Sequence, residues 1–168
     1  MILFLAGASH TGKTLLSQRL MERFHIPYLS IDHLKMGLIR SGNTDLTPMD
    51  DDKLTQYLWP IVREMIKTAI ENRQNLIVEG CYIPFDWAND FSAEYLQDIR
   101  CCYLIFSKEY IENHFAQIVK FAGVIEKRLD DSGLDKNELI RENEENLAQC
   151  RKYGCRYILI DGDYDVRI

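Results

Sequence analysis

The stretch Gly7-Ala8-Ser9-His10-Thr11-Gly12-Lys13-Thr14 decides the fold of this 168-residue chain. It follows the apolar run Ile2–Ala6 and leads into the amphipathic segment Lys13–Phe24, so it joins a predicted strand to a predicted helix. In that context the pattern G-x-x-x-x-G-K-T predicts a phosphate-binding loop (P-loop). Its glycines let successive backbone N–H groups point inward, and the helix adds the positive end of its dipole.

Two residues of this loop are expected to act through their side chains. Lys13 would reach the β- and γ-phosphates of a nucleoside triphosphate, and the Thr14 hydroxyl would ligate Mg²⁺. His10 is expected to contribute its backbone N–H, with a contact to substrate as the alternative. The whole stretch could also be an ordinary glycine-rich turn, but its flanking strand and helix favour nucleotide binding.

Composition and charge narrow the class of protein. An apolar content of 46% and a charged content of 27% are ordinary for a globular domain, and the length fits a single one. The net charge of −6 argues against a broad surface for nucleic acid or anionic membrane. No apolar run approaches the roughly 20 residues of a membrane span, and no signal-peptide pattern is present. The five cysteines lack metal-ligand spacing, which predicts reduced thiols and a cytoplasmic protein.

Short apolar runs alternate with longer segments of helical period, which is typical of a parallel sheet covered on both faces. Strands are predicted at Ile2–Ala6, Tyr28–Ile31, Leu76–Glu79, Cys101–Phe106 and Tyr157–Ile160. The pattern therefore indicates one doubly wound α/β domain spanning residues 1–168.

The segments between the strands have helical periodicity. Lys13–Phe24 places apolar residues on one face at Leu16, Leu20 and Phe24. Asp50–Asn72 does so at Leu54, Leu58, Ile61, Met65 and Ala69, and Pro60 inside it is expected to kink or split that helix. Further helices are predicted from about Lys108 to Gly133 and from about Asp135 to Tyr153, the second ended by Gly154.

Carboxylates that follow the strands are the first candidates for chemistry, because ligands of such sheets lie outside the carboxyl ends of the strands. Asp32 is predicted to accept a proton or orient the substrate, and its alternative role is the N-cap of a helix beginning at His33. Glu79 is predicted to contact substrate or metal-bound water, with a salt bridge to an arginine as the alternative. With Thr14, these two carboxylates form the predicted Mg²⁺ site.

Cationic side chains are needed around the transferring phosphoryl group of an otherwise acidic protein. Lys35 and Arg40 are candidates for the substrate side. Arg128 is the candidate catalytic arginine of a lid at about residues 122–136, and Arg141 is next in line. For both arginines the alternative is ordinary charge pairing on a solvated helix surface. The aromatic residues Tyr82, Phe85 and Trp87 could wall a substrate pocket or pack under a loop, with neither favoured.

With this loop, the acidic turn after the second strand and Val78-Glu79-Gly80, the chain resembles the P-loop small-molecule kinases. These include adenylate, shikimate and gluconate kinases and the relatives of chloramphenicol phosphotransferase and zeta toxin. The resemblance implies a parallel sheet in the order 2-3-1-4-5 with helices on both faces. It also implies a substrate-binding helical region at about 33–72 and a lid between strands four and five.

The same resemblance implies that ATP and Mg²⁺ are the cofactors and that a small molecule accepts the phosphoryl group. Asp32 falls where several such kinases place an Asp that contacts substrate or acts as base, and Lys35 matches a basic residue three positions later. Cys81-Tyr82-Ile83-Pro84 stands where adenylate kinases continue to an arginine, and this chain has none there. The ending Lys152-Tyr153-Gly154 is similar to small bacterial kinases called 2-phosphoglycerate kinase-like.

Three functions therefore stay open. The leading one is an ATP-dependent kinase of a small molecule, acting as a monomer or homodimer without nucleic-acid or membrane partners. The second is a nucleoside or nucleotide kinase, and the third is a nucleotide-binding regulatory module with slow hydrolysis. A guanine-reading N-K-x-D motif, expected of a switch GTPase, is missing after the fourth strand, where the sequence is Ser107-Lys108-Glu109-Tyr110.

Overall fold

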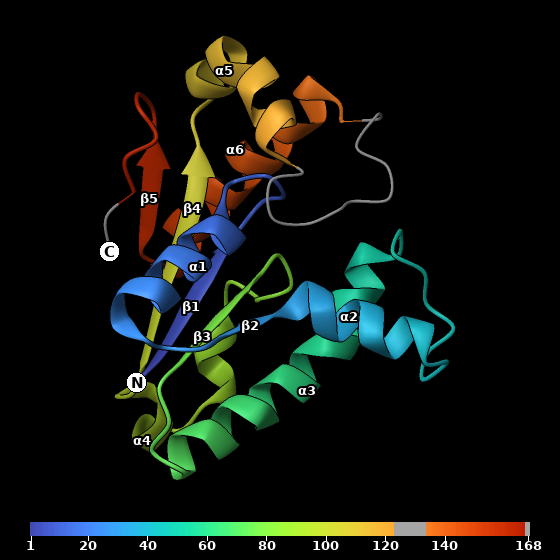
Figure 1. The fold of residues 1–168 in the computed structure, drawn as a ribbon, viewed down its shortest axis with the longest axis vertical. Coiled ribbons are helices and arrows are strands. Elements are labelled where there is room, and N and C mark those ends of the chain that lie inside the picture. The colour runs from blue at the N-terminus through green and yellow to red at the C-terminus, as the bar shows by residue number, and fades with distance from the viewer. Residues whose placement is uncertain (123–133, 167–168) are drawn as a thin grey trace.

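A parallel five-stranded sheet forms the centre of the protein (Figure 1). The structure, a computed structural model, describes residues 1–122 and 134–166. The strands are β1 (Ile2–Gly7), β2 (Tyr28–Ser30), β3 (Leu76–Gly80), β4 (Ile99–Phe106) and β5 (Tyr157–Ile160). All four pairings are parallel and the spatial order is β2-β3-β1-β4-β5, so the predicted fold class and strand order are confirmed.

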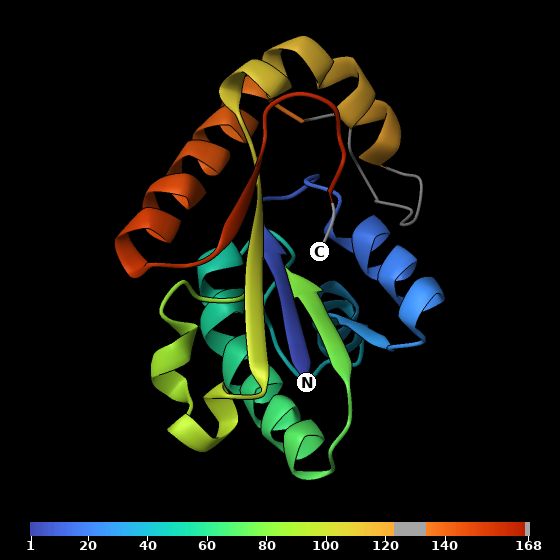
Figure 2. The same cartoon turned by 90° about the vertical axis from the view of Figure 1, so that its left-hand side faces the viewer.

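Helices cover both faces of this sheet, which explains why its strands are apolar throughout (Figure 2). They are α1 (Lys13–Phe24), α2 (Ile31–Arg40), α3 (Asp51–Glu71), α4 (Ala93–Leu96), α5 (Lys108–Ala122) and α6 (Lys136–Tyr153), with a 3₁₀ turn at Trp87–Asp90. Along β1, Phe4 packs in the core beneath α3, and the next residue, Leu5, packs in the core beneath α1. Successive side chains of one strand therefore anchor two separate layers.

Helix α3 runs through Pro60 without a break, so the expectation that Pro60 could split this segment is wrong. Pro60 is exposed, and buried residues on both sides of it hold the helix against the sheet, among them Leu58 and Val62. Proline costs the helix one hydrogen bond, but packing on both sides offsets that loss. The buried face also differs from the predicted one, because Met65 is 40% exposed and Ile66 is buried in its place.

Several element boundaries fall where the sequence predicts them. Helix α1 has the predicted bounds, although Phe24 at its end is half exposed rather than packed. The Asp135 side chain caps α6 by accepting hydrogen bonds from two backbone N–H groups, and Gly154 ends this helix in the left-handed region at φ 67°. Most of the predicted lid, including Arg128, lies outside the described residues.

The remaining expectations concern the cysteines and the membrane. All five cysteines carry free thiols. In the described part of the chain, no helix combines the length and apolar character that crossing a membrane requires.

Candidate active site

The loop between β1 and α1 has the backbone of a phosphate cradle. Gly7 has a φ of +137° and Gly12 a φ of +82°, values that other residues adopt only with strain. A Cβ on Gly7 would lie 2.3 Å from the carbonyl oxygen of Leu104, so β1 can approach β4 here only without a side chain. The buried Thr11 hydroxyl donates to the Ala8 carbonyl (2.9 Å) and fixes the curl from inside.

The Lys13 side chain folds back across this loop toward the end of β3. It is only 6% exposed. Its ammonium donates to the Ala8 carbonyl oxygen at 2.7 Å and to the Cys81 sulfur at 3.5 Å. The Ser9 hydroxyl lies 3.8 Å from the same sulfur, so the loop and the turn after β3 meet at Cys81. This places the predicted phosphate-binding lysine inside the cradle.

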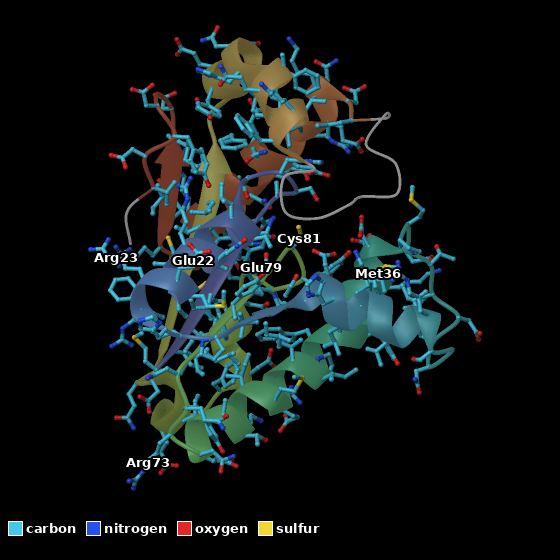
Figure 3. The ribbon with its side chains drawn as sticks, in the orientation of Figure 1. Glu22, Arg23, Met36, Arg73, Glu79 and Cys81 are labelled. Carbon is cyan, nitrogen blue, oxygen red and sulfur yellow. The ribbon has the colours of Figure 1, made fainter. Side chains whose placement is uncertain are left out.

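Thr14 and Glu79 are brought together because α1 begins beside β3. The Thr14 hydroxyl donates to a Glu79 carboxylate oxygen at 3.2 Å, and Glu79 is buried at the carboxyl end of β3 (Figure 3). Within the described residues, no three His, Cys, Asp or Glu side chains gather as a complete metal site. Mg²⁺ commonly takes one or two protein oxygens with phosphate oxygens and water. A hydroxyl beside a carboxylate at the cradle fits that requirement.

A second polar cluster connects α2, α3 and the turn after β3. The Lys35 ammonium forms a 2.5 Å ion pair with Asp32 and donates to the Tyr82 hydroxyl at 2.9 Å. Tyr82 in turn donates to the Asp51 carboxylate at 2.9 Å. Burial, together with the charges of Asp51 and Asp32, raises the pKa of Tyr82, so this phenol stays neutral and can donate. We call Asp32, Lys35, Tyr82 and Asp51 the acceptor-side cluster.

The role of Asp32 as a helix N-cap is excluded by the start of α2. This helix begins at Ile31 with Ser30 as the N-cap residue, so Asp32 lies in the first turn. The helix dipole favours a carboxylate at that position. The Asp32 side chain is 31% exposed beside its ion pair with Lys35, and it is therefore open to a ligand.

Helix α6 carries a half-buried carboxyl group, Glu142, whose pKa is raised. Burial raises the pKa of Glu142, and the negative charges of Glu138 and Asp51 raise it further, whereas Arg141 and Lys13 lower it.

Other candidate residues lie away from this cluster. Arg40 is exposed in the last turn of α2, eight residues beyond Asp32 and about 12 Å along the helix axis. Arg141 is exposed and pairs with Glu138 at 3.3 Å, as its surface alternative predicts. Two of the three aromatic residues are half-buried and pack against the core: Phe85 stacks on Tyr103 and Trp87 meets Phe4 edge-on.

Three residues at the site were not predicted from the sequence. Cys81 and Asp51 have no motif around them. Tyr164 comes from the segment after β5, which arches back over the loop (Figure 2), and its hydroxyl donates to the Thr11 carbonyl at 3.0 Å. Each of them is placed by tertiary packing, which the sequence does not reveal. Only the position of Cys81 could have been suspected, because the predicted strand order puts the end of β3 next to the end of β1.

Comparison with known proteins agrees with this geometry at the level of the fold. No protein-family model and no curated protein sequence matches the chain. Solved structures do match. A candidate kinase from Chloroflexus aurantiacus is 20% identical, with a TM-score of 0.56 over 97% of this chain and 88% of that one. The shikimate kinase of Acinetobacter baumannii is 15% identical, with a TM-score of 0.54 over 98% of this chain and 84% of that one.

The deoxyadenosine kinase of M. mycoides is 16% identical, with a TM-score of 0.56 over 98% of this chain and 92% of that one. The chain has the fold of the P-loop small-molecule kinases. This confirms the resemblance seen in the sequence. At these identities the similarity establishes the fold alone, and the chemistry depends on the residues of the site.

Proposed function

We propose that this protein is an ATP-dependent kinase that transfers the γ-phosphoryl group to a small-molecule acceptor. One observation carries the proposal: Lys13 of the cradle contacts Cys81, and the next residue, Tyr82, is hydrogen-bonded to both Lys35 and Asp51. A phosphate-binding group and a carboxylate-rich cluster are therefore one residue apart along the turn after β3. Phosphoryl transfer requires that adjacency, because donor and acceptor must meet in line.

The roles of the side chains follow from their positions. The loop N–H groups and Lys13 would hold the phosphates, and Thr14 and Glu79 would hold Mg²⁺, which would neutralise charge on the phosphates. Asp32 would accept the proton of the acceptor hydroxyl. Lys35, predicted as a substrate ligand, is better assigned as a positioning residue, because Asp32 and Tyr82 already engage its ammonium. Arg128 stays the predicted source of positive charge from the lid.

The site favours this function over a nucleotide kinase. Recognition of a nucleotide phosphate generally uses the bidentate fork of an arginine. The turn that starts at Cys81 carries no arginine, and Arg40 and Arg141 are exposed on helix surfaces. We place the enzyme in the cytoplasm as a monomer or homodimer, in keeping with its reduced thiols.

The test is transfer of labelled γ-phosphate from ATP to a complete metabolite extract. We expect a labelled product other than inorganic phosphate, and we expect Lys13→Ala to abolish it while the far-ultraviolet circular dichroism is unchanged. Lys67→Ala is the matched control, because Lys67 pairs with Glu64 on the surface of α3. Release of inorganic phosphate alone would contradict the proposal and favour a regulatory nucleotide-binding module.

A further inference from the structure

We propose that Tyr164 is a positioning residue of the phosphate-binding loop: its hydroxyl holds the Thr11–Gly12 peptide so that the Gly12 N–H faces the phosphates of ATP. The proposal rests on the proposed function, because it concerns how that site binds its nucleotide. Tyr164 belongs to the segment after β5, residues 161–166, which we call the C-terminal strap. This strap crosses back over the loop (Figure 2).

The Thr11–Gly12 peptide lies outside the hydrogen-bond ladder of α1. Gly12 has a φ of +82° and no side chain, so its backbone can turn either way at little cost. The ladder begins one carbonyl later, where the Leu16 N–H donates to the Gly12 oxygen at 2.9 Å. Among the described residues, the donor to the Thr11 carbonyl is the Tyr164 hydroxyl, at 3.0 Å. The restraint on this peptide therefore comes from the strap.

The ring of Tyr164 supports the hydrogen bond by closing over Gly12. A Cβ on Gly12 would lie 2.1 Å from the Tyr164 hydroxyl oxygen and 2.8 Å from the ring carbon Cζ. The same ring meets Phe106, at the end of β4, with a centroid distance of 6.3 Å and an interplanar angle of 70°. Burial raises the pKa of Tyr164 to about 12, so the hydroxyl keeps its proton at neutral pH and stays a donor.

The hydrogen bond sets the direction of the Gly12 N–H. The strap follows β5 and contacts the end of β4, whereas the Lys13 ammonium contacts Cys81 at the end of β3, on the other side of β1. Every described peptide bond is trans, and a trans peptide points its C=O and N–H in opposite directions. With the Thr11 oxygen held toward the strap, the Gly12 N–H is turned toward the side of the Lys13 ammonium, where an anion would be bound.

The test compares Tyr164→Phe with the wild type by calorimetric titration of two ligands, ATP·Mg²⁺ and inorganic tripolyphosphate with Mg²⁺. Phenylalanine keeps the ring over Gly12 and removes the donor. We expect both dissociation constants to rise about three- to tenfold, as the loss of one neutral hydrogen bond requires. A rise for one ligand only, or for neither, would overturn this inference and leave the kinase assignment intact. Failure of the wild type to bind either ligand would overturn both.

Tyr110→Phe is the matched control. Tyr110 stacks on the same Phe106, and within the described residues no hydrogen bond joins its hydroxyl to the loop. This variant should leave the binding of both ligands unchanged, even where its free energy of unfolding falls as far as that of Tyr164→Phe. Equal losses of binding in the two variants would reduce Tyr164 to a structural role and overturn the inference.

The Gly12 amide gives a direct measurement by NMR after selective ¹⁵N labelling of glycine. Its proton should move downfield when tripolyphosphate with Mg²⁺ binds the wild type, because the N–H then donates to an anion. Tyr164→Phe should lessen that movement. A Gly12 resonance that stays in place at saturating tripolyphosphate would overturn the inference.

Discussion

Alkylation of Cys81 is expected to weaken nucleotide binding while leaving the fold intact. The thiol is exposed, so an adduct there disturbs no core packing. Its sulfur lies 3.5 Å from the Lys13 ammonium and 3.8 Å from the Ser9 hydroxyl. An acetamide group extends roughly 4 Å beyond the sulfur, as its bond lengths require, and therefore fills the space in which phosphate oxygens would meet Lys13.

The expected loss of affinity follows from the contact that the adduct displaces. A hydrogen bond to a charged group contributes about 1.5–3 kcal/mol. Losing the one between Lys13 and a phosphate oxygen should therefore weaken ATP binding roughly 10- to 150-fold. Iodoacetamide should act mainly at this thiol, because burial raises the pKa of the other thiols, those of Cys101, Cys102, Cys150 and Cys155.

The assay combines peptide mass spectrometry, which measures modification at each cysteine, with calorimetric titration of ATP·Mg²⁺. Saturating ATP·Mg²⁺ should slow modification of Cys81, and Cys81→Ser should bind ATP normally and resist the reagent. Complete modification of Cys81 with unchanged ATP affinity would refute the placement of the phosphates between Lys13 and this turn.

Three further substitutions test separate parts of the site. Asp32→Asn keeps a polar side chain beside Lys35 but cannot accept a proton, so kcat should fall by a factor of about 10²–10⁴ with little change in stability. A normal kcat in this variant would mean that Asp32 has only a structural role. Gly12→Ala should lower the free energy of unfolding by about 2–4 kcal/mol in urea titrations, because φ is +82° and the new Cβ would lie 2.1 Å from the Tyr164 hydroxyl. Adding Tyr164→Ala to this variant should recover part of the loss. If the two substitutions changed the free energy of unfolding additively, the clash would be contradicted. Asn143→Leu should lower the free energy of unfolding by about 1–3 kcal/mol, because the buried Asn143 amide oxygen accepts a hydrogen bond from the last backbone N–H of β4 at 2.9 Å. An unchanged free energy of unfolding would mean that this N–H finds another partner.

The fold could be predicted from the sequence because its signals are local. The loop from Gly7 to Thr14 joins a strand to a helix, and the other strands are continuous apolar runs that need cover on both faces. The expectation that Pro60 could split the helix failed because local propensity was weighed without the packing of the residues on either side. The start of α2 was predicted two residues late, since Asp32 is a good capping residue and Ser30, which precedes Ile31, is another.

The phosphate side of the site could be predicted from local sequence signals, whereas the acceptor side could not. Lys13 and Thr14 belong to one continuous motif, so spacing alone predicts where they point. Asp51 and Tyr82 lie 31 residues apart in the sequence, and Asp51 is one of two acidic residues in the first turn of its helix. They become distinctive only when the fold brings α3 against the turn after β3 and joins them by a hydrogen bond. A kinase fold can therefore change its acceptor by altering single charges at such positions, and the motif that binds the nucleotide would not record the change.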